Sequence, residues 1–79
     1  MDIQAQIAYY PLAEADYRGI VRELLAEITA TDLDAQVTPM ATIVKGEQSR
    51  VLGLVERLVT RFFARYASIL QVTFSNACG

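Results

Sequence analysis

The sequence of 79 residues contains no histidine and only one cysteine. Histidine is the usual general base at neutral pH and the commonest metal ligand, so its absence removes the easiest route for most enzyme classes. Because Cys78 is alone, neither an intrachain disulfide nor a cysteine metal cluster can form, which suits a reducing compartment. Glycine is also scarce, and no glycine-rich phosphate loop follows a predicted strand.

Long apolar runs and an excess of positive charge are missing as well. No run approaches the roughly 20 apolar residues that a membrane-spanning helix needs. Residues 1–5 lack the basic and apolar regions of a signal peptide, so we expect a cytoplasmic protein with no membrane insertion. The formal net charge is −2 and the pI is near 4.9. This balance argues against a nucleic-acid binder, which normally carries a basic surface.

Apolar residues make up 53% of the chain, which is too many for a disordered tail. The length fits one domain, and we expect a single domain over residues 1–79. A chain of this size buries only about 60% of its unfolded surface when it folds alone. We therefore favour a homo-oligomer, either a dimer or a tetramer, over a monomer.

Two hydrophobic periodicities divide the chain into elements. Residues 3–10 alternate as in a half-buried strand, with Ile3, Ala5, Ile7 and Tyr9 on one face and Gln4, Gln6, Ala8 and Tyr10 on the other. Pro11 ends this strand because it cannot donate to a continuing ladder. Helical spacing then predicts helices over residues 13–29 and 47–66, and the apolar positions of the second cover about half its circumference.

Three further strands complete the prediction. Residues 35–38 and 41–45 form two short strands joined at Pro39 and Met40, a joint too short for a helix, so the two should be antiparallel. Residues 68–75 are rich in amino acids that favour strands. The resulting order, βαββαβ, predicts an α+β ferredoxin-like fold, with two helices on one face of a four-stranded antiparallel sheet. One copy leaves the other face of the sheet bare, so this face must be polar or covered by another subunit.

Arg57, Arg61 and Arg65 recur every four residues along the second helix. Arginines in such a stripe suit an anion or phosphate site. The simpler interpretation is a solvated face whose charges pair with Glu23 and Glu27 of the first helix or of a neighbouring subunit, and we favour it.

Catalytic chemistry has few candidates. Cys78 has no histidine to activate it and lies beside the last residue, so we interpret it as an ordinary terminal thiol. Asp32 and Asp34 fall in a connecting segment typical of a solvated turn. We expect no enzymatic activity, no metal and no cofactor.

The candidate binding residues lie at the strand ends and in the joint between the middle strands: Tyr9, Tyr10, Thr38, Met40 and Thr42. Alternation points Tyr9 toward the helices, and Thr42 can share that side on another strand. A small aromatic heterocycle could pack on Tyr9 while the Thr42 hydroxyl bonds a ring nitrogen. Plain core packing explains the same pattern, and from the pattern alone it is the preferred reading.

Three stretches of the chain resemble the YkoF family, whose members bind thiamine and its hydroxymethylpyrimidine moiety. These are residues 9–12, 38–46 and 73–79, in matching order and spacing. Some members carry two ferredoxin-like domains in tandem, whereas related thiamine-binding proteins have one domain and assemble as oligomers. The segment Thr38–Met40 is closer to the single-domain relatives.

The resemblance implies a pyrimidine pocket between sheet and helices. The family's first-strand position before the Tyr-Pro pair falls on Tyr9, and its threonine at the start of the third strand falls on Thr42. We therefore expect a non-enzymatic binder of thiamine or hydroxymethylpyrimidine, acting as a carrier or transport accessory. The alternatives are a homo-oligomeric interaction module that uses the bare sheet face and the wide apolar surface of the second helix, and, less favoured, a small α+β enzyme.

Overall fold

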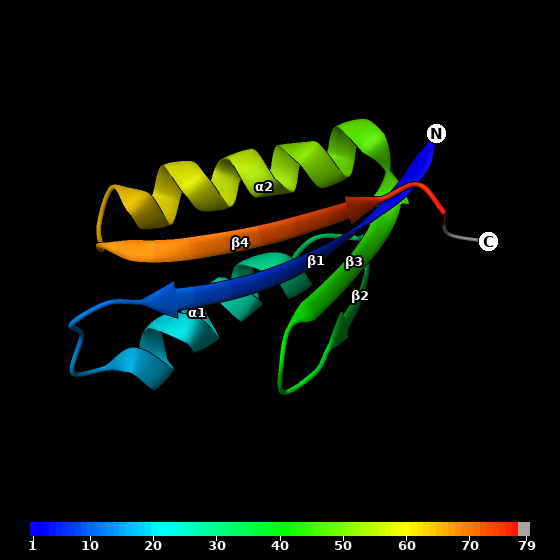
Figure 1. Ribbon diagram of the computed structural model, residues 1–79. Coiled ribbons are helices and arrows are strands. Elements are labelled where there is room, and N and C mark those ends of the chain that lie inside the picture. Colours follow the sequence, from blue (N-terminus) through cyan, green and yellow to red (C-terminus); the bar gives the residue numbers. More distant parts are fainter. Residues whose placement is uncertain (78–79) are drawn as a thin grey trace.

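The computed structural model describes residues 1–77, and Cys78 lies outside them. Its elements are β1 (Asp2–Pro11), α1 (Tyr17–Thr29), β2 (Asp34–Val37), β3 (Thr42–Glu47), α2 (Gln48–Phe63) and β4 (Ser68–Ser75). The strands form one antiparallel sheet in the order β2-β3-β1-β4. Both helices lie on one side of this sheet (Figure 1). The predicted ferredoxin-like α+β fold is thus confirmed.

The core lies between the sheet and the two helices. The inward positions of β1 are buried, as its alternation predicts, because β1 is a central strand flanked by β3 and β4. From α1 the core takes Ile20, Leu24 and Ile28, and from α2 it takes Val51, Leu54, Leu58 and Phe62. Val44 of β3 completes it. These residues recur at the helical spacing read from the sequence, so one apolar line on each helix is enough to fix its orientation.

Helix α1 begins four residues later than the periodicity predicts. Ala13 has a φ angle of 56°, in the left-handed region that breaks a right-handed helix. Asp16 is the N-cap, and its carboxylate accepts a hydrogen bond from the Gly19 amide at 3.2 Å. Glu14 and Asp16, which fall within the predicted range of residues 13–29, therefore precede the helix.

Helix α2 also differs at its ends from the predicted range of residues 47–66. Glu47 is its N-cap and accepts from the Ser49 amide at 3.0 Å. The helix ends at Phe63, and the Tyr66 amide bonds the Phe62 carbonyl at 2.9 Å beyond it. Because Glu47 is also the last residue of β3, the strand passes directly into the helix.

The outer face of the sheet is not covered by either helix. Here Gln6 pairs with Ile43 on one side and Thr73 on the other, while Tyr10 pairs with Ile69. Tyr10 and Ile69 expose 43% and 52% of their surfaces. The mixed polar and apolar character agrees with the expected bare face. Within residues 1–77, no helix is long and apolar enough to cross a membrane.

Candidate functional site

An apolar pocket of about 130 Å³ brings all five predicted binding residues together. Tyr9 and Tyr10 come from the end of β1, Thr42 begins β3, and Thr38 and Met40 belong to the β2–β3 loop. The opposite wall is α1, through Tyr17, Val21, Leu24 and Leu25. The pocket therefore lies between the sheet and α1, at the end of the sheet where β1 and β2 finish.

Tyr9 supplies the most unusual group in this pocket. Its side chain is only 7% exposed, and its ring packs edge-on against Phe62 of α2 with centroids 5.6 Å apart. Among the described residues, its buried hydroxyl group has no hydrogen-bond partner. A buried hydroxyl without a partner costs about 1–3 kcal/mol, so such groups are rare unless a bound molecule or water completes them.

Thr42 lies near Tyr9 on the inner side of the sheet. It is 4% exposed, and Ile7 of β1 is its partner across the strands. Tyr9 is two residues beyond Ile7 on the same face, which makes Tyr9 and Thr42 diagonal neighbours. Tyr9 and Thr42 thus both line the sheet side of the pocket, and each carries a hydroxyl group.

Thr38 organises the loop at the mouth of the pocket. Its hydroxyl accepts from the Met40 and Ala41 amides at 3.3 and 3.1 Å and donates to the Ala41 carbonyl at 2.6 Å. Because these bonds occupy its hydroxyl, Thr38 holds the β2–β3 loop in place. Met40 is 86% exposed and stands at the rim.

The lining of the pocket suits an uncharged aromatic ring. None of its residues carries a formal charge at neutral pH, and its polar side chains are the hydroxyls of tyrosine and threonine. A cavity of about 150 Å³ is known to hold benzene, so this one matches a single six-membered ring. Within residues 1–77, no cluster of acidic or cysteine side chains could hold a metal ion.

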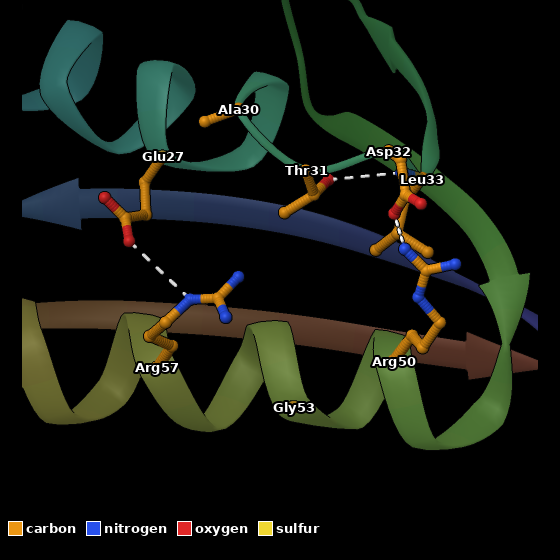
Figure 2. Close-up of a pocket in the computed structure, with 8 residues that line it drawn as sticks. All are labelled: Glu27, Ala30, Thr31, Asp32, Leu33, Arg50, Gly53 and Arg57. Carbon is orange, nitrogen blue, oxygen red and sulfur yellow. Dashed lines mark hydrogen bonds and ion pairs between the residues drawn. The ribbon is translucent and has the colours of Figure 1, made fainter.

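A second, larger cleft lies between the helices and is polar. It has a volume of about 720 Å³ and is lined by Arg50 and Arg57 of α2, with Glu27 of α1 and Asp32 facing them. Figure 2 shows both arginines directed at these carboxylates, with Gly53 between them on α2. Arg50 pairs with Asp32, and the Arg57 Nε lies 3.6 Å from Glu27. The charges in this cleft therefore satisfy one another.

The same pairing continues along the arginine stripe. Arg61 reaches Glu27 at 3.0 Å, and Arg65 pairs with Glu23. The hydrogen bond to Glu23 raises the pKa of the Arg65 guanidinium above its ordinary value. The predicted pairing of this stripe with Glu23 and Glu27 is confirmed, and the stripe joins α2 to α1.

Sequence reasoning missed the wall that α1 contributes to the pocket. Tyr17, the first residue of α1, is 46% exposed and lines the pocket. Periodicity predicts which face of a helix is buried, but it does not predict how much space remains between that face and the sheet. An aromatic residue in the first turn was the one available signal.

Comparisons with known proteins point to one family. A family model described as thiamine-binding protein matches residues 5–73. A solved structure from Thermotoga maritima, described as a proposed thiamine biosynthesis/salvage protein, has a TM-score of 0.85 at 18% identity, over 95% of this chain and 83% of that one. A Streptococcus pneumoniae protein has a TM-score of 0.90 at 15% identity, over 99% and 89% of the chains. No curated protein sequence matches. At such identities the solved structures establish the fold alone.

Proposed function

Because the chain belongs to the thiamine-binding protein family, we propose that it is a non-enzymatic protein that holds the hydroxymethylpyrimidine ring of thiamine in the apolar pocket. The observation that carries this proposal is the Tyr9 hydroxyl, buried beside the pocket without a partner. The size of the pocket supports it, since about 130 Å³ suits one ring and not the entire vitamin.

In this proposal the two inner hydroxyls recognise the polar edge of the pyrimidine. Thr42 bonds a ring nitrogen, and the Tyr9 hydroxyl bonds a second polar group of the ring. Leu24 and Leu25 cover the flat face from α1. The positively charged thiazolium then lies at the rim near Tyr17 of α1, whose ring face attracts a cation by about 0.5–2 kcal/mol.

The lining of the pocket favours binding over catalysis. The wall contains no carboxylate, lysine or histidine, the side chains that most often transfer protons near neutral pH. We propose that the protein acts as a carrier or transport accessory, and that it needs no cofactor.

Thermal unfolding with hydroxymethylpyrimidine and with thiamine tests the proposal. A ligand at 100 times its dissociation constant stabilises the folded state by about 2.7 kcal/mol. For a domain of this size, the midpoint should rise on the order of ten degrees. A rise with both compounds, and none with the free thiazole half, supports recognition through the pyrimidine. If neither compound moves the midpoint at millimolar concentration, the proposal is wrong.

A pair of threonine variants locates the site. Thr42→Val keeps the shape of the side chain but removes its hydroxyl, and should weaken hydroxymethylpyrimidine binding by roughly 5–20-fold, the equivalent of one hydrogen bond. Thr73→Val makes the same change on the outer sheet face, where the residue is exposed, and should leave the affinity unchanged. Titration calorimetry measures both. Equal affinities for the two variants would remove Thr42 from the site.

A further inference from the structure

The polar cleft between α1 and α2 is a second cavity that is large enough for a small molecule. Its volume of about 720 Å³ lies in the range of sites for small organic ligands. Arg50, Gly53 and Arg57 line it from one face of α2, because residues three and four positions apart are neighbours on a helix. Among the described residues, the cleft and the apolar pocket share no lining residue. The cleft is therefore a separate place at which a ligand can bind.

Arg57 is paired in charge with Glu27, but most of its hydrogen-bond donors remain unused. Its Nε lies 3.6 Å from the Glu27 carboxylate, which is longer than a hydrogen bond. Figure 2 shows its two other nitrogens turned away from Glu27 and toward the middle of the cleft. In the part of the chain that the structure describes, neither of these nitrogens donates a hydrogen bond. A guanidinium carries five N–H donors in a planar fork, so Arg57 can still bind an oxyanion.

Gly53 keeps the floor of the cleft open between the two arginines. A Cβ at this position would meet no atom within 4 Å, so there is room above its backbone. Gly53 lies about one helical turn from each arginine, and the Cα atoms of Arg50 and Arg57 are about 10 Å apart along the helix. The two long side chains therefore approach the space above Gly53 from opposite ends, and an anion placed there is within reach of both.

The charges around the cleft favour an anion. In the ion pairs of residues 1–77, four arginines of α2 meet three carboxylates, because Glu27 is shared between Arg57 and Arg61. Asp32, the partner of Arg50, has a side chain that is 70% exposed. An exposed pair contributes little to stability, so Arg50 can exchange Asp32 for an anion of higher charge at little cost. This excess of positive charge is local, since the entire chain carries a formal charge of −2.

From these features we infer that the cleft binds the diphosphate group of a small organic molecule, with Arg50 and Arg57 each holding one phosphoryl group above Gly53. Arginine suits phosphoryl oxygens because its planar fork forms two parallel hydrogen bonds. Two linked phosphoryl groups match two arginines at opposite ends of the cleft better than a single group does. Ala30 and Leu33 also line the cleft, and they provide an apolar wall for the organic part of the ligand. The site does not rest on the ligand proposed for the apolar pocket.

Titration calorimetry with pyrophosphate and with inorganic phosphate, at fixed ionic strength and without divalent cations, tests the charged part of the site. Pyrophosphate should bind roughly 10-fold more tightly than phosphate, because it engages both arginines. Arg57→Gln leaves Glu27 paired with Arg61, and should weaken pyrophosphate binding roughly 10-fold or more. Arg18→Gln is the matched control, since it removes the same charge at an exposed position of α1 outside both cavities. No binding at millimolar pyrophosphate, equal affinities for the two anions, or equal losses in the two variants overturns the inference.

A second pair of variants tests where the anion lies. Gly53→Leu places a side chain in the space between the two arginines, and should weaken pyrophosphate binding by roughly 10-fold or more because the phosphoryl groups lose that space. Thr60→Leu adds the same side chain at an exposed position of α2 outside the cleft, and should leave the affinity unchanged. Leucine favours a helix more than glycine or threonine does, so both variants should fold, which circular dichroism verifies. Wild-type affinity in Gly53→Leu would contradict the inference.

Discussion

The Tyr9 hydroxyl is buried at a cost to the free protein. Its ring contributes fully to the core through the edge-on contact with Phe62, so the ring alone would serve stability. The hydroxyl oxygen of Tyr9, which has no hydrogen-bond partner among the described residues, does not stabilise the free protein. Residues that break a local rule in this way are expected at functional sites, where the cost is recovered when a ligand binds.

Tyr9→Phe should therefore change stability and binding in opposite directions. Removing the hydroxyl relieves an unsatisfied buried group, so the free energy of unfolding of the free protein should rise by about 1 kcal/mol. Affinity for hydroxymethylpyrimidine should fall roughly 5–20-fold because one hydrogen bond is lost. Chemical denaturation and calorimetry measure the two effects. A variant that loses stability and keeps full affinity would assign the hydroxyl to the core.

For single residues, the sequence predicted which side of the sheet a side chain lies on better than it predicted what that side chain contacts. Alternation placed Tyr9 and Thr42 on the inner side, because a strand has a fixed period of two. It could not show that the Thr38 hydroxyl is occupied by the Ala41 backbone, since that bond depends on the closed shape of the loop. Nor could it show that Tyr9 finds no partner.

Among elements, α1 and α2 contain glycines with contrasting surroundings. A Cβ on Gly19 would lie 2.2 Å from the Asp16 carboxylate, which caps α1 through the amide of that glycine. A Cβ on Gly53 would meet nothing within 4 Å, because this position opens onto the polar cleft. The sequence alone does not distinguish the two glycines, but an added methyl group would collide with Asp16 at position 19 and would meet no atom at position 53.

Gly53→Ala should stabilise the protein by about 0.5–1 kcal/mol, since alanine loses less backbone freedom in a helix interior and has room here. The midpoint of thermal unfolding should rise by about 2–8 degrees. Gly19→Ala is the contrasting variant, and should lower the midpoint because it displaces the Asp16 cap. Ligand binding should be unaffected by Gly53→Ala. A loss of stability at position 53 would show that the cleft has no room for a methyl group.

Element ends were the least predictable part of the fold. Apolar spacing gave the correct faces for both helices, but the periodic pattern of α1 reached back to Ala13, whose left-handed backbone no periodicity reveals. A cap is a local bond between one side chain and one amide. Asp16 therefore signalled the true start only once its bond to Gly19 was visible.

Over the whole molecule, charge holds the two helices together while apolar residues fix the sheet beneath them. The sequence predicted that the arginines of α2 pair with Glu23 and Glu27, either within the chain or in a neighbouring subunit, and the structure shows the pairing within the chain. The sequence could not predict the volume of the pocket, which depends on how far α1 stands from the β2–β3 loop. Such distances follow from the packing of the entire core.

Glu27 is the centre of this charged contact, so its removal tests how much the contact contributes. Its side chain is 21% exposed and bonds Arg57 and Arg61 together. Glu27→Gln leaves two guanidinium groups near each other without their anion, and should lower the free energy of unfolding by about 1 kcal/mol at low salt. Glu56→Gln removes the same charge at an exposed position on α2 and should change stability by less than about 0.5 kcal/mol.

Denaturation of both variants at low salt and at 1 M sodium chloride separates charge from packing. At 1 M salt the Debye length is about 3 Å, so the difference between the two variants should largely disappear if it comes from ion pairs. The equal change in net charge excludes a general field effect as the cause. A deficit in Glu27→Gln that persists at high salt would mean that the side chain stabilises the helices by packing instead.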